Sequence, residues 1–310
     1  MKTTLDCIPC FFRQALEAAR LAGADATLQR RILCDVAEAL PGFSLDASPP
    51  EMARIIHGRV RERTGNADPY RSIKERSNRM ALDAARRLSS LLDGEADRLR
   101  TAVRLSIAGN IIDYGAKNSL NVDAALKRML DGGKDALPAP APDFFHFPDF
   151  ETGLREAGTI LFLADNAGEI AFDRLLLEEI TRRHPEKEIV VAVKEKPAIN
   201  DALFRDALDC GLQAAARIVS SGSDTPGTPL SRCSREFLEL YRRADMIISK
   251  GQGNFETLSD AERPVFFLLL TKCPVIARDI GCAVGDAVLI HHRGKAAGQA
   301  GRRSGVSDGS

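Results

Sequence analysis

Asp165 and Asn166 place a carboxylate and an amide directly after an uninterrupted apolar segment, residues 160–164, near the middle of the chain. Asp201 follows a second apolar segment, residues 189–193, after a short polar stretch. Carboxylate and amide oxygens are hard ligands, which suit Mg, Mn or a similar octahedral divalent ion and argue against a thiolate zinc site. The three residues are therefore candidate ligands of one divalent ion that keeps coordination positions open for a substrate.

A lysine and several glycines follow the apolar segments as well. Lys250 comes directly after residues 246–249, and the glycines are Gly168, Gly222, Gly227, Gly251 and Gly253. Glycine permits close approach of the backbone, and helices that begin there offer free N–H groups and a positive dipole end to a phosphate. A phosphoryl group held between the metal ion and Lys250 would be polarised for attack by water or by a carboxylate such as Asp165. Hydrolysis of a phosphomonoester is the resulting hypothesis, with Asp165 and Lys250 as catalytic candidates.

The elements that must position these residues follow from the hydrophobic periodicity. Apolar segments alternate with segments of helical spacing, which predicts βα units and a parallel sheet covered by helices. The expected strands are 160–164, 189–193, 216–219, 246–249, 265–270 or 275–277, and 288–290, and the expected helices are 169–183, 201–210, 231–242 and 255–261. Ligands bind at the carboxyl ends of parallel strands, and neighbouring strands lie about 4.8 Å apart. Asp165, Asn166 and Asp201 are therefore expected to reach a common ion at one edge of the sheet.

The N-terminal part of the chain shows amphipathic helical spacing and no convincing strand. We therefore expect an all-helical domain over residues 1–137. Closely spaced prolines in residues 138–149 predict an extended connection without regular structure. The α/β domain would then span residues 150–293, and residues 294–310, rich in Gly, Ala, Arg and Ser, are expected to form a disordered tail.

The composition limits the classes of partner. The 310 residues include 43 basic and 43 acidic side chains, so no net field favours nucleic acid or an anionic membrane. No apolar run approaches the roughly 20 residues of a membrane span, and the N-terminus lacks the apolar core of a signal peptide. We expect a cytoplasmic protein that binds neither nucleic acid nor membrane. The seven cysteines indicate buried thiols, although Cys7 and Cys10 at a helix start fit a structural pair and a redox or metal-binding pair equally well.

Each candidate residue also has an ordinary structural interpretation. Asp165 and Asp201, taken singly, are typical helix caps, Lys250 taken singly is typically solvated, and a glycine loop marks only a turn. The recurrence of such residues at four successive strand ends favours a ligand site. Spacing alone still leaves a metal site and a metal-free nucleotide pocket open.

Several blocks of the sequence, in the same order, carry a family resemblance. The blocks are Cys7-Ile-Pro-Cys10-Phe with Arg13-Gln-Ala-Leu16, Ala108-Gly-Asn110-Ile-Ile-Asp113, Asp165-Asn-Ala-Gly-Glu-Ile170 followed by Phe172-Asp173, Pro197 with Ile199-Asn-Asp201-Ala202, Pro226-Gly227, and Ser249-Lys-Gly-Gln-Gly-Asn-Phe-Glu256. Together they resemble the damage-control phosphatases, the ARMT-like family also catalogued as domain of unknown function eighty-nine. The Cys-x-x-Cys start resembles the prokaryotic branch of that family.

The resemblance implies a three-layer α/β/α, Rossmann-like parallel sheet with an N-terminal helical domain. It implies metal-dependent hydrolysis of phosphometabolites, such as sugar phosphates or damaged phosphorylated metabolites. Asp165, Asn166 and Asp201 would hold one divalent ion (Mn, Mg, Co or Ni), and Lys250 would contact the substrate phosphate. The other substrate-binding candidates are Asn110, Asp113, Gly168, Glu169, Gly251 and Asn254.

Two other classes of function stay open. One is a non-catalytic phosphometabolite- or nucleotide-binding protein that uses the same glycine loops. The other is an S-adenosylmethionine-dependent carboxyl methyltransferase. A methyltransferase should carry a glycine-rich loop after its first strand, where Gly168 stands nearly alone.

Overall fold

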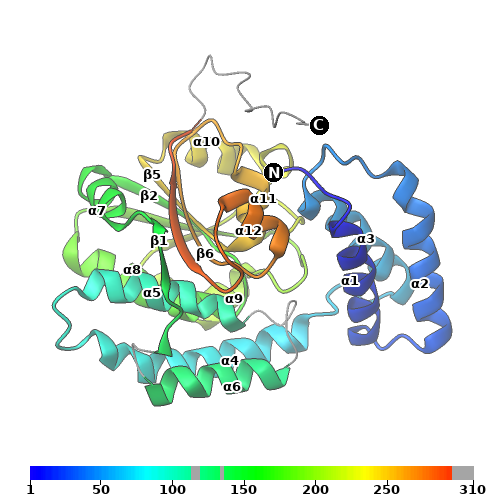
Figure 1. Cartoon of the computed structure of the whole chain (residues 1–310), viewed down its shortest axis with the longest axis horizontal. Helices are drawn as coiled ribbons and strands as arrows, with labels where there is room; N and C mark the ends of the chain where they lie inside the picture. The colour runs from blue at the N-terminus through cyan, green and yellow to red at the C-terminus, as the bar shows by residue number, and fades with distance from the viewer. Residues whose placement is uncertain (113–118, 133–135, 295–310) are drawn as a thin grey trace, which may run out of the picture.

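The computed structural model describes residues 1–112, 119–132 and 136–294 (Figure 1). The predicted site residue Asp113 and the tail from residue 295 lie outside the described residues. The N-terminal helices are α1 (Cys7–Leu21), α2 (Ala26–Ala39), α3 (Pro49–Thr64), α4 (Arg71–Leu88), α5 (Arg98–Gly109) and α6 (Ser119–Gly132). The strands are β1 (Pro140–Phe145), β2 (Thr159–Leu163), β3 (Glu188–Val193), β4 (Arg217–Ser220), β5 (Met246–Lys250), β6 (Val265–Leu270) and β7 (Ala287–His292). The helices between them are α7 (Phe147–Glu156), α8 (Glu169–Arg183), α9 (Phe204–Asp209), α10 (Arg235–Arg243), α11 (Gly251–Leu258) and α12 (Pro274–Ile280).

The strands form one sheet in the order β1-β7-β6-β5-β2-β3-β4. Neighbouring strands are parallel, except that β7 runs antiparallel to β6. From β2 the chain first builds outward through β3 and β4, then returns to the other side of β2 to add β5 and β6. The order therefore reverses between β2 and β5, and such a switch point is where open α/β sheets bind ligands. The prediction of an α/β fold with N-terminal helices and a mostly parallel sheet is confirmed.

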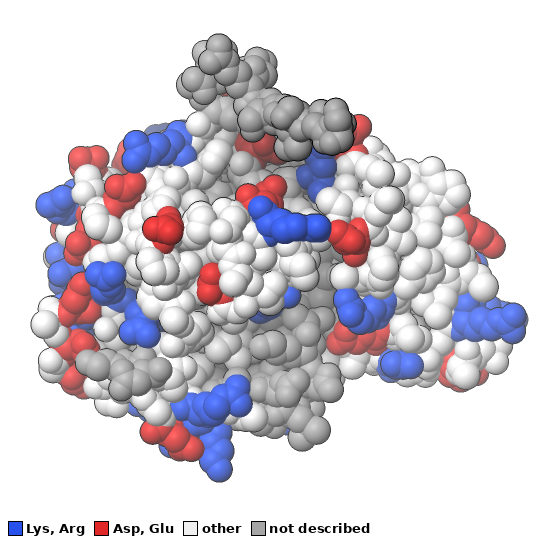
Figure 2. All heavy atoms as spheres, viewed as in Figure 1, with Lys and Arg blue, Asp and Glu red and all other residues white. Residues whose placement is uncertain are grey.

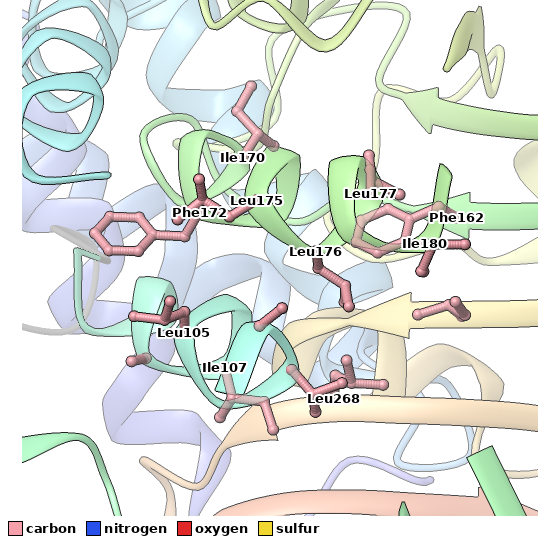
Figure 3. Packing of buried hydrophobic residues seen from close by; sticks show 14 of the residues in the cluster. Leu105, Ile107, Phe162, Ile170, Phe172, Leu175, Leu176, Leu177, Ile180 and Leu268 are labelled. Carbon is pink, nitrogen blue, oxygen red and sulfur yellow. The ribbon is translucent and has the colours of Figure 1, made fainter. Parts of the chain in front are cut away.

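Alternate residues of the central strands enter two different hydrophobic cores, as a strand buried on both faces requires. Ile160 and Phe162 of β2 pack with α5 and α8, whereas Leu161 and Leu163 pack with α10, α11 and α12. Figure 3 shows the first of these cores, where Leu105 and Ile107 of α5 approach the buried side chains of α8. Helices thus cover both faces of the sheet.

The helices before the sheet divide into two groups. Helices α1 to α3 enclose a small core of their own and form a lobe beside the sheet (Figure 1). Helices α4 and α5 instead share the core that covers one face of the sheet. The hydrophobic cores therefore separate near Arg71, well before the proline-rich segment where composition changes.

One secondary-structure prediction is wrong, and one pair of alternatives is resolved. The proline-rich segment, expected to lack regular structure, contains β1. This strand lies at the sheet edge and pairs only with β7, and an edge strand tolerates Pro140 and Pro142 because a missing N–H there need not break the ladder. Of the two alternative strands, residues 265–270 are confirmed as β6, and residues 275–277 lie inside α12.

The surface agrees with the balanced composition. Basic and acidic side chains are interspersed over the face drawn in Figure 2, without a large patch of one sign. Among the helices of the described residues, none is long and apolar enough to cross a membrane.

Candidate functional site

Two loops meet at the carboxyl end of β2. The loop after β3 turns back so that Asn166 and Asp201 form an isolated antiparallel bridge. The amide of Ala202 donates to the carbonyl of Asp165 at 2.8 Å, and the amide of Ala167 donates to the carbonyl of Asn200 at 2.9 Å. These backbone bonds hold the three predicted metal ligands beside one another, although 36 positions of sequence separate Asp165 from Asp201.

The backbone of Ile199 shapes the second loop. Its φ is +50°, the left-handed region, which is costly for a β-branched residue. The bend comes immediately before Asn200 and Asp201, whose backbone engages the first loop. The surrounding contacts therefore hold a strained turn at the position that presents Asp201.

A cavity of about 840 Å³ opens over these strand ends. Its wall includes Asp165, Asn166 and Asp201, which are 7, 4 and 4% exposed. The opposite wall comes from the helical lobe, where α1 contributes Cys7 and Cys10 and α3 contributes several apolar residues. The structure thus brings the three predicted ligands to a single cavity between the sheet and the lobe.

A network of amides and carboxylates holds the loop after β2, which carries Asp165 and Asn166. The amide nitrogen of Asn110 donates to Asp165 Oδ2 at 3.1 Å and to Glu169 Oε2 at 2.6 Å. The amide nitrogen of Asn166 donates to the same two oxygens, at 2.7 and 3.2 Å. Because both nitrogens face carboxylates, both amide oxygens point away from them. The network therefore fixes the orientation of the Asn166 and Asn110 side chains, with their amide oxygens directed away from the two carboxylates.

Lys250 lies behind this network and has no exposed surface. Its ammonium donates to the carbonyl of Ser106 at 2.8 Å, to Glu169 Oε1 at 2.7 Å and to Asp173 Oδ1 at 2.6 Å. Burial disfavours the charge, but Asp173 and Glu169 outweigh it and raise the pKa of Lys250 above its ordinary value. Burial also raises the pKa of Asp173, to about 6, although the charge of Lys250 opposes the shift. The contact between Lys250 and a substrate phosphate stays a prediction. In this structure the ammonium donates its hydrogen bonds to protein groups.

The other predicted substrate-binding residues fall into two groups, one on the cavity wall and one buried behind it. Asn110 lies on the cavity wall, whereas Gly168, Glu169, Gly251 and Asn254 lie behind it. Gly168 donates its N–H to Asn78 Oδ1 at 2.7 Å. Asn254 donates to the carbonyls of Ala164 and Lys250 at 3.2 and 2.8 Å. These residues join α4, β2 and α11 to the loop that carries Asp165 and Asn166.

Gly251 shows how closely α11 packs on this loop. Its φ is +76°, and a Cβ at this position would lie 1.8 Å from Asp165 Oδ2. We expect Gly251→Ala to destabilise the protein by about 2–4 kcal/mol, because backbone strain adds to a clash with a fixed carboxylate. Gly94→Ala is the matched control, since Gly94 has a φ of +79° with nothing within 4 Å of the added carbon. Urea unfolding measures the free energy of unfolding of both variants. Equal losses of stability would mean that the clash with Asp165 contributes nothing.

Several residues of the cavity wall were not among the predicted site residues. Gln14 and Arg13 lie on α1, Glu256 lies on α11, and Lys272 follows β6. Lys272 could have been found, because it occupies a strand end as Asp165 does. Arg13, Gln14 and Glu256 stand in the blocks that carry the family resemblance. Spacing alone gave them no role, because their approach to the cavity depends on how the lobe packs against the sheet.

The donor set fits a hard divalent ion. Among the described residues, no group of three or more His, Cys, Asp or Glu side chains is arranged to hold a metal. The donors that the two loops bring to the cavity wall are two carboxylates and the Asn166 amide oxygen, and such oxygens suit Mg or Mn. Asn110 Oδ1 is also buried and accepts no hydrogen bond from the described residues. A buried acceptor without a donor is what a cation or its water would satisfy.

The fold and the site together define a class: an α/β protein with an oxygen-rich cavity at the switch point of its sheet. A model of the damage-control phosphatase ARMT1-like domain matches residues 3–288, so the chain belongs to that family. It is 33% identical over 299 residues to a protein of Pyrococcus horikoshii named damage-control phosphatase, covering 95% of this chain and all of that one. It is 36% identical over 299 residues to an uncharacterized protein of Methanocaldococcus jannaschii, covering 94% of this chain and 95% of that one.

A solved structure supports the same placement. The structure of a family protein from Pyrococcus horikoshii superimposes with a TM-score of 0.81 at 32% sequence identity, covering 95% of this chain and 100% of that one. The resemblance predicted from the sequence blocks is confirmed.

Proposed function

We propose that the protein is a metal-dependent phosphomonoesterase that acts on small phosphorylated metabolites at the carboxyl edge of its sheet. The observation that carries the proposal is the bridge between Asn166 and Asp201, which puts both residues and Asp165 on the wall of one cavity. Family membership supports hydrolysis of a phosphate ester as the reaction.

Asp165, Asn166 and Asp201 would hold one divalent ion. Such an ion supplies Lewis-acid polarisation of a phosphoryl oxygen and neutralises charge that develops in the transition state. Lys272 reaches the same cavity from the end of β6 and would add a cation beside the phosphate. Glu169 and Lys250, both fully buried, keep Asn110 and Asn166 oriented toward the site.

The cavity also indicates the size and character of the substrate. Its volume of about 840 Å³ lies within the range of small-molecule sites, roughly 300–1,000 Å³. The wall opposite the metal ligands belongs to α1 and α3, so the lobe would select among phosphometabolites. Whether a sugar phosphate or a damaged phosphorylated metabolite fits is then decided by α1 and α3.

Phosphate release from a panel of phosphomonoesters tests the proposal. We expect turnover with Mn, Mg, Co or Ni, loss of turnover with a chelator, and recovery when the ion is returned. The measurement is inorganic phosphate released by the full chain, with metal-free buffer as the control. Binding of phosphometabolites without turnover under every metal would instead identify a non-catalytic binding protein, and methyl transfer from S-adenosylmethionine would identify a methyltransferase.

A further inference from the structure

One face of α11 lines the cavity. Gln252, Gly253 and Glu256 lie on its wall, and their spacing places them on the same side of the helix. The helix begins at Gly251, where its backbone is packed against the Asp165 carboxylate. Glu256 therefore lies rather more than one helical turn beyond Gly251, on the cavity wall that Asp165 also lines.

The side chain of Glu256 differs from that of Gln252 in its contacts. Gln252 Oε1 accepts hydrogen bonds from the backbone amides of Lys272 and Cys273, at 2.6 and 3.2 Å. Glu256 accepts one from the N-terminal amine of Met1, at 2.7 Å, but through its backbone carbonyl. Within the described part of the chain, its carboxyl group has no hydrogen-bond donor. A carboxyl group on a cavity wall without an internal partner is available to a ligand.

The direction of the side chain favours contact with the site. Side chains on α-helices lean toward the N-terminal end of the helix. This tendency directs Glu256 toward the turn of Gln252 and Gly253, which lies nearer to Asp165. Gly253 has no side chain to fill that space, and its carbonyl packs against Gly227 instead.

The surroundings keep a proton on Glu256 near neutral pH. Burial raises the pKa of Glu256 to about 7, against the opposing charge of the Met1 ammonium. The thiol of Cys7 on α1 is its other titratable neighbour, and burial raises the pKa of Cys7 so that this thiol is neutral. The remaining charged residues of the cavity wall on the lobe side and after β6 are Asp6, Arg13, Glu17, Arg20 and Lys272.

A proton donor near the bridging oxygen accelerates hydrolysis of an alkyl phosphate. When the bond between phosphorus and the bridging oxygen breaks, an alkoxide would leave unless it is protonated. A phosphoryl group held at Asp165, Asn166 and Asp201 directs the rest of its ester into the remaining cavity, where Glu256 lies. The ester oxygen and the carboxyl group therefore share one space.

We infer that Glu256 is the general acid of the reaction, an inference that rests on the proposed function. The carboxyl proton passes to the bridging oxygen as the bond from phosphorus to that oxygen breaks, and the product leaves as an alcohol. Water forms the new bond to phosphorus and releases one proton, which restores the Glu256 carboxyl group. No oxidant or further reactant is needed.

Leaving-group dependence tests this role. Glu256→Gln keeps the shape of the side chain but cannot donate a carboxyl proton. We expect its kcat for an alkyl phosphate, the panel sugar phosphate that the wild type turns over fastest, to fall roughly 10²–10⁴-fold, the usual contribution of general acid catalysis. Turnover of 4-nitrophenyl phosphate, whose leaving group needs no proton, should stay within about threefold.

Three further readouts separate this role from a structural one. The KM for the alkyl phosphate should stay nearly constant, and the loss of wild-type activity above a pH near 7 should vanish in the variant, because only the protonated acid is active. Glu256→Asp should recover part of the rate. Glu239→Gln, at an exposed position of α10, is the matched control and should leave turnover of both substrates unchanged.

The outcomes distinguish the two proposals. Equal losses on both esters, or a higher KM with an unchanged kcat, would overturn the role of Glu256 while the phosphatase activity stands. Wild-type protein without turnover of any ester under any metal would overturn the proposed function and this inference with it.

Discussion

Asp201→Ala is expected to lower metal-dependent phosphate release by well over 100-fold. Even partners that only orient a metal ligand cost roughly 10–100-fold when they are removed, and Asp201 is one of two carboxylates in the donor set. The measurement is kcat/KM across a metal titration, since a lost ligand should also shift half-activation to higher metal concentration. Retention of full metal-dependent turnover would remove Asp201 from the site.

The controls for this variant address folding. Asp201 Oδ2 lies 3.5 Å from the ammonium of Lys194, whose side chain is 3% exposed and also donates to the carbonyl of Gly227. Removing the carboxylate therefore leaves a buried cation with one partner fewer, and thermal unfolding must be followed beside activity. Asp209→Ala, on α9 of the same βα unit and 53% exposed, should change neither activity nor stability.

The sequence was sufficient to predict the meeting of Asp165, Asn166 and Asp201. Strands buried on both faces are continuous apolar runs, so their ends are visible as abrupt changes to polar residues. Parallel connections then place those ends on one edge of the sheet, whatever the details of packing. The detail that closes the site, the antiparallel bridge and the strained turn at Ile199, depends on contacts between loops and leaves no periodic signal.

The surroundings of Lys250 could not be predicted from the same rule. Spacing places it correctly at the end of β5, but its exposure is decided by helices that cover it. Its partners Ser106 and Asp173 lie 144 and 77 positions away in the sequence. Glu256 is the opposite case: it was not predicted as a site residue, but it lies on the cavity wall. An acidic residue inside a short helix is typically solvated, and only the packing of α1 beside α11 brings it to the site.

Lys250→Met is expected to destabilise the protein by about 3–5 kcal/mol, the usual consequence of leaving buried charges without their partner. Glu169 and Asp173 are both fully buried and lie within 2.7 Å of the ammonium. Urea unfolding at neutral pH measures the loss, with Lys196→Met as the control. Lys196 is exposed in the loop after β3, and its replacement should stay within about 0.5 kcal/mol of wild type.

The pH dependence of this loss has a definite sign. The pKa of Asp173 is about 6 in the folded protein and 3.8 as its ordinary value, so the folded state holds a proton that the unfolded chain releases between these values. Removing the cation that opposes this shift should raise the pKa of Asp173 further. The variant then gains more stability than the wild type as pH falls through this range, and its deficit should be smaller at pH 5 than at pH 8. A variant that unfolds like the wild type and only binds phosphate esters more weakly would instead make Lys250 a substrate contact.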